Sequence, residues 1–181
     1  VQACPLPTAV LSNQTGYGSY FWDDYTDRMQ LIMDEWKKMG FKPDGVYTGF
    51  LADARQVDVI LKFTDMFCTD ETHILIDPVM GDGGNIYRTY SEELCEKMRI
   101  LVQHATVITP NLTEACRILD LDYHKVDLSE EGLVAICEAL SDMGPSRIVI
   151  TGLQQGDLIF NYIFEKNKTS ELLSTRKIGG D

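Results

Sequence analysis

Hydrophobic and polar residues follow two distinct patterns along the chain. Short runs rich in β-branched and aromatic residues have the composition of strands, and longer segments repeat apolar residues every three or four positions, as amphipathic helices do. We predict strands over residues 8–12, 45–48, 73–77, 106–109, 147–151 and 158–164. We predict helices over residues 26–39, 54–67, 91–103 and 129–143. This alternation indicates βαβ units and a mostly parallel sheet with helices on both faces.

The C-terminal part of the chain departs from this alternation. Residues 157–164 and 171–178 are two strand-like runs separated by the polar segment 165–170, a pattern typical of a β-hairpin. No internal repeat or linker divides the sequence, so we predict one α/β domain over residues 1–181. A complete domain of this type usually opens with a strand and closes with helices. We therefore expect that an N-terminal strand and C-terminal helices are lacking here.

Composition narrows the class of protein. The 181 residues carry a net charge of −12, which argues against a nucleic-acid-binding surface, and no apolar run is long enough to span a membrane. The five cysteines are an odd number without a Cys-x-x-Cys pair, so neither a disulfide framework nor a zinc site is expected. We interpret Cys95 and Cys137 as small buried hydrophobic residues and expect a reducing, cytoplasmic location.

Candidate chemistry lies after the predicted strands, where open α/β sheets bind ligands. Asp77 and Asp82, with glycines between and after them, follow the strand that ends at residue 77. Two carboxylates and a flexible backbone suit hydrated magnesium and phosphate groups. Asp-Pro and Gly-Gly are also ordinary turn formers, so the local string favours a ligand site and a plain turn equally.

The segment Thr109-Pro110-Asn111-Leu112-Thr113-Glu114 follows the next strand. Asn111 is a good helix N-cap, and Glu114 is placed to complete a capping box. A metal-bridged phosphate would also settle at such a helix N-terminus. Taken alone, the segment favours the structural cap.

Three further polar turns complete the set. Thr151-Gly152 follows a strand and either contacts phosphate or ends that strand. The segments 12–18 and 48–50 each combine hydroxyl groups, glycine and an aromatic residue, which suits a small planar ligand but also occurs in plain loops. The shared placement of these turns after successive strands is typical of a kinase-like α/β domain.

Four of these segments together resemble the bacterial pyridoxal kinases of the ribokinase-like superfamily. They are Ser12-Asn13-Gln14-Thr15-Gly16-Tyr17-Gly18, Thr48-Gly49-Phe50, Asp77-Pro78-Val79-Met80-Gly81-Asp82 and Ile108-Thr109-Pro110-Asn111-Leu112-Thr113-Glu114. Their order and spacing match over essentially the whole chain. The Asp-Pro-Val and Thr-Pro-Asn segments are typical of the superfamily, whereas residues 12–17 and Tyr87 are more specific to pyridoxal kinases.

The resemblance implies a three-layer ribokinase-like fold and transfer of the ATP γ-phosphoryl group to the 5′-hydroxyl of pyridoxal, pyridoxine or pyridoxamine in vitamin B6 salvage. It assigns ATP and phosphate binding to Asp77, Asn111, Glu114 and Thr151. It assigns magnesium, with a possible potassium or sodium ion, to Asp77, Asp82, Thr109 and Glu114. It assigns the vitamer to Thr15, Phe50 and Tyr87, with Tyr87 in a flap loop over the site. It also implies a homodimer.

The sequence departs from the family pattern at vitamer-binding positions and at the catalytic loop. Gln14 and Phe50 occupy positions where histidine and tyrosine are frequent. The N-terminal strand with its pyridoxal-binding serine, and the Gly-Thr-Gly-Asp loop that supplies the catalytic Asp, are not in this sequence. Gly179-Gly180-Asp181 resembles that loop only superficially, so we expect the catalytic Asp beyond Asp181. We therefore predict that residues 1–181 alone are inactive.

Two alternatives stay open. A hydroxymethylpyrimidine kinase of thiamine synthesis shares the phosphate-side segments and would differ around residues 12–18 and 48–50. A non-catalytic module that binds a B6 vitamer is the second alternative, and the missing Gly-Thr-Gly-Asp loop is its only support.

Overall fold

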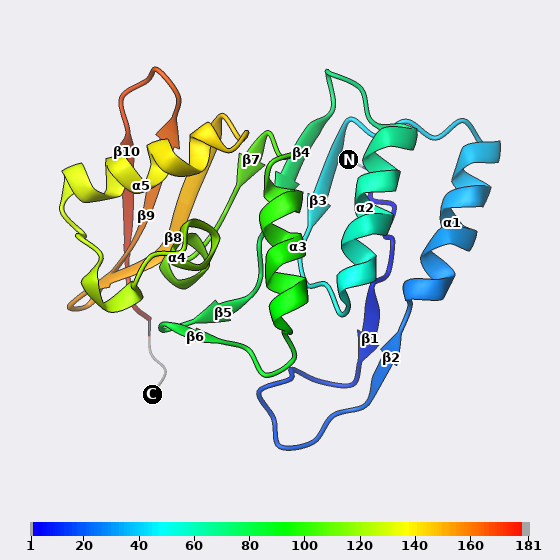
Figure 1. The fold of residues 1–181 in the computed structure, drawn as a ribbon, viewed down its shortest axis with the longest axis horizontal. Helices are drawn as coiled ribbons and strands as arrows, with labels where there is room; N and C mark the ends of the chain where they lie inside the picture. Colours follow the sequence, from blue (N-terminus) through cyan, green and yellow to red (C-terminus); the bar gives the residue numbers. More distant parts are fainter. Residues whose placement is uncertain (1, 179–181) are drawn as a thin grey trace.

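A six-stranded sheet forms the centre of the computed structural model, which describes residues 2–178 (Figure 1). Its strand order is β10-β9-β8-β7-β4-β3. The strands are β3 (Gly45–Thr48), β4 (His73–Ile76), β7 (Val107–Ile108), β8 (Arg147–Gln155), β9 (Leu158–Glu165) and β10 (Glu171–Arg176). β3, β4, β7 and β8 are parallel, and β8, β9 and β10 pair antiparallel. The mostly parallel sheet and the C-terminal hairpin are confirmed.

Five α-helices connect or flank these strands. They are α1 (Thr26–Lys38), α2 (Ala54–Phe67), α3 (Glu92–Val102), α4 (Leu112–Leu119) and α5 (Glu130–Asp142). A short 3₁₀ helix, Tyr123–Lys125, follows α4. The predicted helices agree with α1, α2, α3 and α5 to within one residue at each end, because their apolar spacing and end signals are strong. For α4 the sequence indicated only the N-cap.

The helices of the described residues form one layer on one face of the sheet, whereas helices on both faces were predicted. Consecutive helices contact one another from α1 to α5, and Figure 1 draws this layer in front of the strands. The topology explains the arrangement. The chain places β3, β4, β7 and β8 side by side in one direction, and right-handed crossovers then put every connecting helix on the same face.

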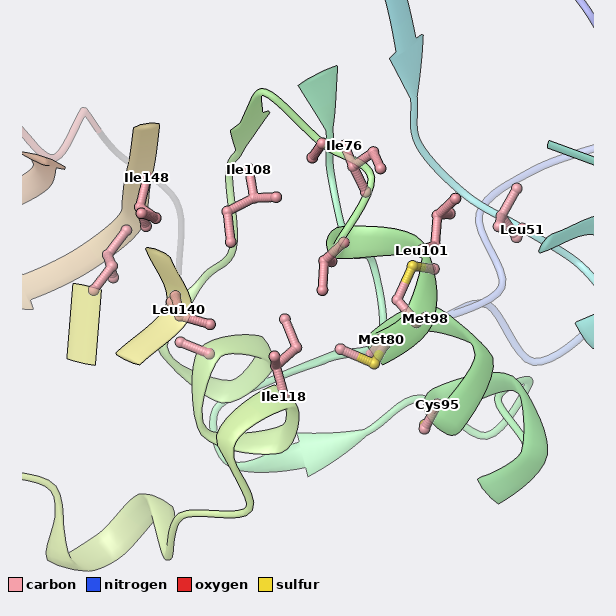
Figure 2. Close-up of a cluster of buried hydrophobic side chains, with 14 of the residues drawn as sticks. Leu51, Ile76, Met80, Cys95, Met98, Leu101, Ile108, Ile118, Leu140 and Ile148 are labelled. Atoms are coloured by element: carbon pink, nitrogen blue, oxygen red, sulfur yellow. The ribbon is translucent and has the colours of Figure 1, made fainter. Parts of the chain in front are cut away.

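The hydrophobic core lies between the sheet and this helical layer (Figure 2). Side chains from alternate strand positions and from three helices are fully buried there: Ile76, Ile108, Ile148, Met98, Leu101, Ile118 and Leu140. The side chains at the intervening strand positions point to the other face of the sheet. There Tyr47 is 68% exposed, and Leu75, Val107 and Val149 are half-buried. The strands therefore carry apolar side chains on both faces, although the described helices cover only one.

The predicted strand at residues 8–12 forms, but it lies outside the central sheet. β1 (Ala9–Leu11) pairs antiparallel with β2 (Trp22–Asp24) in a separate hairpin. The sequence pattern missed β2, because its two acidic residues hide the strand character. Residues 12–18 therefore belong to the loop at the tip of a hairpin and not to the end of a central strand. In Figure 1 this hairpin lies at the edge of the molecule where the parallel strands end.

A second small hairpin lies at the same edge. It consists of β5 (Gly81–Asp82) and β6 (Asn85–Ile86) and follows β4 after a short connection. Figure 1 places it below α3 and beside α4. The turn residues predicted after the strand at 73–77 thus build a hairpin, which the sequence pattern did not specify.

Two expectations from composition concern cysteines and membrane spans. Cys95 and Cys137 are buried at 2% and 0% exposure, and all five cysteines, which lie within residues 2–178, are free. The interpretation of these two residues as buried hydrophobic side chains is confirmed. Within residues 2–178, no helix has the length and apolar character needed to cross a membrane.

The one-sided core generates a first prediction. Ile148→Ala should lower the free energy of unfolding by about 2–4 kcal/mol, because it leaves a cavity at a fully buried position. Leu172→Ala on the edge strand β10, where the leucine is 55% exposed, should change it by less than about 1 kcal/mol. Urea unfolding followed by circular dichroism measures both values. Equal losses in the two variants would contradict the described core.

Candidate active site

Backbone hydrogen bonds join the ends of the parallel strands into one continuous edge. Asp77 N donates to Thr48 O at 3.0 Å, and Thr109 N donates to Ile76 O at 3.1 Å. Thr151 N donates to Pro110 O at 2.9 Å, and Thr151 bridges to Asn111. The predicted residues after three different strands therefore lie side by side, as expected for carboxyl ends of parallel strands.

The N-terminus of α4 contains a buried carboxylate. Asn111 Oδ1 accepts from Glu114 N at 3.0 Å, and Glu114 Oε2 accepts from Asn111 N at 2.8 Å, which completes the predicted capping box. The second carboxylate oxygen, Oε1, accepts from Met80 N at 3.1 Å. Glu114 is only 4% exposed, so this side chain is more than a surface cap. It ties the segment after β4 to the helix after β7.

Two more contacts from α4 hold the β5–β6 hairpin. Asn111 Nδ2 donates to Gly81 O at 2.7 Å, and Thr113 Oγ1 accepts from Gly84 N at 2.8 Å. Gly83 and Gly84 have φ angles of 56° and 79°, which a two-residue type I′ turn requires. The glycines of this segment thus allow a tight hairpin whose position α4 determines.

The sequence predicted that Thr151 ends a strand, and this prediction is wrong. β8 continues to Gln155, and its pairing with β9 is irregular between Ile150 and Leu153. Gly152, with φ of 69°, adopts the left-handed conformation at this irregularity. The bulge places Thr151 beside Asn111 while the strand runs on into its hairpin.

Acidic groups gather at this edge and affect one another. Burial raises the pKa of Glu114 to about 7; the N–H groups of Asn111 and Met80 oppose the shift, and the charge of Asp77 adds to it. Burial also raises the pKa of Asp77, whose Oδ2 accepts a hydrogen bond from the Tyr47 hydroxyl at 3.2 Å. These two carboxylates form an electronegative pair that a cation would stabilise.

Tyr87 lies close to the same group of carboxylates. Burial raises the pKa of its phenol, and the charges of Asp82, Glu114 and Asp77 raise it further. Its backbone N–H donates to Met80 O at 2.9 Å, which fixes the start of the segment after β6. The charges of Asp82, Glu114 and Asp77 therefore all act on the Tyr87 phenol.

The donor set at this edge fits a hydrated divalent cation better than a closed protein cage. Within residues 2–178, no group of three or more His, Cys, Asp or Glu side chains is close enough to hold a metal ion. Both oxygens of Glu114 already accept backbone hydrogen bonds. Magnesium commonly keeps several waters and uses one or two carboxylates together with substrate phosphates, which this arrangement allows.

An aromatic cluster surrounds Phe50 at the same edge. Its ring meets Trp22 edge-on at a centroid distance of 5.6 Å and Tyr90 at 6.0 Å. Its carbonyl accepts from Thr8 Oγ1 at 2.9 Å, and the next backbone N–H, of Leu51, donates to Tyr90 Oη at 3.4 Å. The sequence pattern indicated Phe50 but not Trp22 or Tyr90, because neither of these two belongs to a recognisable segment.

Thr15 is half-buried in a turn of the loop between β1 and β2. The contact to Phe50 that the structure records from this hairpin comes from Trp22. The sequence-predicted residues thus form two groups, which are the acidic edge at the N-terminus of α4 and the aromatic cluster beside the β1–β2 hairpin. Tyr87 and Tyr90 link the groups, because Tyr90 N donates to Tyr87 O at 2.9 Å.

Comparison with known proteins gives consistent matches. The phosphomethylpyrimidine kinase family matches residues 25–179. The pyridoxal kinase of Arabidopsis thaliana is 32% identical over 164 residues, which cover 86% of this chain and 50% of that protein. The hydroxymethylpyrimidine/phosphomethylpyrimidine kinase of Bacillus subtilis is 24% identical over 145 residues, which cover 77% of this chain and 51% of that protein. The chain spans about half the length of these curated relatives.

A solved structure shows the same architecture. A protein from Bacteroides thetaiotaomicron, described provisionally as a phosphomethylpyrimidine kinase, superposes with a TM-score of 0.94 at 37% sequence identity. The match covers 99% of this chain and 62% of that one. A second crystal form of the Bacteroides protein contains pyridoxal and superposes with a TM-score of 0.92. The predicted ribokinase-like fold is therefore confirmed.

Burial of Glu114 generates a second prediction, which concerns pH. Its folded-state pKa of about 7 lies above the ordinary value of 4.5, so the folded protein binds this proton more tightly than the unfolded chain. The corresponding stability is present below about pH 4.5 and is lost as the pH rises through about 7. We expect the free energy of unfolding to fall by on the order of 2 kcal/mol between pH 5 and pH 8.

Glu114→Gln tests the assignment of this slope. The amide no longer titrates, so stability should vary less between these pH values, although it should be lower by about 1–3 kcal/mol because an NH₂ group faces a backbone donor. Glu138→Gln on the exposed side of α5 is the control and should keep the wild-type slope. Urea unfolding at several pH values gives each slope. An unchanged slope in the Glu114 variant would contradict the prediction.

Proposed function

The chain belongs to the phosphomethylpyrimidine kinase family, and on this basis we propose that it is part of an ATP-dependent kinase that phosphorylates the 5′-hydroxyl of a B6 vitamer. Pyridoxal, pyridoxine and pyridoxamine are the proposed substrates. One observation carries the proposal: an acidic edge and an aromatic cluster lie next to each other at the carboxyl ends of parallel strands. The acidic edge suits a metal-bound triphosphate, and the cluster suits a planar ring.

Phosphoryl transfer depends mainly on positioning and on neutralising charge, and the acidic edge supports both. In this proposal Asp77, Asn111, Glu114 and Thr151 orient the ATP phosphates. The N-terminus of α4 favours negative charge through its unpaired N–H groups and its dipole. Asn111 and Glu114 are held by the capping box, so they reach the site in a fixed orientation.

Magnesium fits the acidic side chains of this edge. Asp77, Asp82, Thr109 and Glu114 are the proposed residues that would hold it, through water where the protein offers too few direct ligands, and a potassium or sodium ion would share the site. When bound, the metal would supply positive charge beside the phosphates. Positive charge at this edge would offset the burial that raises the pKa values of Asp77 and Glu114, and it would favour their ionised forms.

The vitamer ring would lie beside the aromatic cluster. Phe50 offers a ring held by Trp22 and Tyr90, Thr15 offers a hydroxyl from the β1–β2 loop, and Tyr87 would cover the site from the segment after β6. Aromatic walls with a few polar groups are typical of sites for small planar ligands. A homodimer and a cytoplasmic location stay predictions from the family resemblance and the composition.

A hydroxymethylpyrimidine kinase is the second candidate function. The family description and the Bacillus subtilis relative favour it. The similarity to pyridoxal kinase over 86% of the chain and the Ser12-to-Tyr17 segment favour the B6 vitamers.

Our third prediction is that the full-length gene product has the higher kcat/KM for pyridoxal. Parallel assays with pyridoxal and hydroxymethylpyrimidine measure it, and a clear preference for the pyrimidine would reverse the choice. The same assay checks the prediction that residues 1–181 alone do not phosphorylate either substrate. Residues 179–181, on which that prediction was partly based, lie outside the described part of the chain.

A fourth prediction tests the acidic edge. Asp77→Asn keeps the size of the side chain and its acceptor for Tyr47, but it removes the charge at the proposed metal site. We expect kcat/KM to fall by about 10²-fold or more, since charge stabilisation is a large part of phosphoryl-transfer catalysis. Asp70→Asn in the exposed turn before β4, at the opposite edge of the sheet, is the control and should retain activity. Coupled detection of ADP release gives the rates. Comparable activity of both variants would remove Asp77 from the proposed site.

A further inference from the structure

One buried amide joins the β1–β2 hairpin to the body of the molecule. Gln56, in the first turn of α2, is 0% exposed. Its Nε2 lies 2.7 Å from Thr8 O, 2.9 Å from Thr26 Oγ1 and 3.2 Å from Asp24 Oδ1, and its Oε1 lies 2.8 Å from Ala52 N. The amide therefore contacts the entry to β1, the end of β2, the start of α1 and the loop that follows Phe50.

The chemistry of these partners determines which end of the amide faces each of them. Ala52 N is a donor and requires the carbonyl oxygen of Gln56, whereas Thr8 O is an acceptor and requires the NH₂ group. Thr26 Oγ1 donates to Asp24 Oδ1 and can therefore accept from Gln56. Each polar atom of the buried side chain therefore has a partner.

The hairpin has few other attachments among the described residues. β1 and β2 pair only with each other, and not with the central sheet. Thr8 Oγ1 donates to Phe50 O at 2.9 Å, and Trp22 packs edge-on against Phe50. On the surface, Arg28 lies 2.9 Å from Asp23 and Arg55 lies 3.8 Å from Asp24, and such exposed ion pairs contribute little to stability. Gln56 is thus the fully buried polar connection of this hairpin.

We propose that Gln56 is a positioning residue that holds the β1–β2 hairpin, and with it the Thr15 loop, in register with the Phe50 segment. The inference rests on the proposed function, because it concerns the vitamer side of that site. Gln56 acts through its neighbours and does not touch the substrate. Its donor side fixes the hairpin at Thr8 and Asp24, and its acceptor side fixes the Phe50 segment at Ala52.

This arrangement predicts a specific kinetic signature. Loss of the donor side would let the hairpin move relative to Phe50, while the acidic edge at the N-terminus of α4 stays in place. The proposed vitamer site would then be disordered without a change at the proposed ATP site. KM for pyridoxal should therefore rise, and KM for ATP should stay near its wild-type value.

Gln56→Glu in the full-length protein separates the two sides of the amide. When ionised, the new carboxylate can still accept from Ala52 N, but it cannot donate to Thr8 O and it faces the negative charge of Asp24. Burial beside Asp24 raises the pKa of this carboxyl group, so the variants are compared at alkaline pH, where it is ionised. Ile60→Val, one turn further along α2 and also buried, controls for a general loss of packing. Thr26→Val, which removes the hydroxyl that accepts from Gln56 Nε2, is a second variant should Gln56→Glu fail to fold.

Two measurements are compared between the variants. Hydrogen exchange should become about 10-fold faster or more in residues 9–24 of Gln56→Glu, with no change in α5, because local opening exposes the hairpin amides. KM for pyridoxal should rise about 10-fold while KM for ATP changes less than about 2-fold. Thr26→Val should shift both measurements in the same direction by a smaller amount, and Ile60→Val should shift neither selectively.

Other results would contradict either the role of Gln56 or the proposed function. Unchanged exchange in residues 9–24, or equal rises in both KM values, would overturn the role of Gln56. If Gln56→Glu does not fold, a Thr26→Val variant with wild-type exchange and KM values would overturn it, because it lacks a hydroxyl that accepts from Gln56. A wild-type protein without pyridoxal kinase activity would overturn the proposed function instead, and the exchange measurement would still decide whether Gln56 anchors the hairpin.

Discussion

The carboxylate of Glu114 is the interaction on which the rest of the candidate site depends. It lies almost fully buried at the N-terminus of α4 and accepts hydrogen bonds from Asn111 N and Met80 N. Those two donors follow different strands, so one side chain connects the ends of β7 and β4. A buried carboxylate without these partners would be strongly unfavourable, and the two segments without the carboxylate would leave buried donors unpaired. This mutual requirement explains how loops with many glycines hold defined positions.

A second polar connection has the same physical basis at the other end of the site. Gln56 is buried and fully hydrogen-bonded, and it joins the β1–β2 hairpin to α2 and to the Phe50 segment. Both connections are buried polar groups whose partners come from segments far apart in the chain. Such groups tolerate few alternative arrangements, because each displaced partner leaves an unsatisfied donor or acceptor. The scaffold of packed helices and strands is apolar, whereas polar contacts orient the loops of the candidate site.

Prediction from the sequence was accurate where local rules dominate. α2 begins and ends as its apolar spacing and the residues around it indicate, and Asn111 and Glu114 form the capping box that their spacing suggests. It was less accurate where long-range pairing decides. β2 is too polar and too short for a recognisable pattern, and it exists because β1 pairs with it. Thr151 seemed to end a strand, but pairing with β9 carries β8 past it through a bulge at Gly152.

The sequence by itself determined the alternation of strands and helices, the capping of α4 and the residues that follow each parallel strand. These features depend on residue type and on spacing within about one helical turn or one strand, so a single sequence contains them. Only the tertiary structure decided that the described helices share one face, that the segment at residues 8–12 leaves the central sheet, and that Trp22, Tyr90 and Gln56 support Phe50. Those outcomes depend on partners dozens of residues away, and local patterns do not specify which partner a buried group will find.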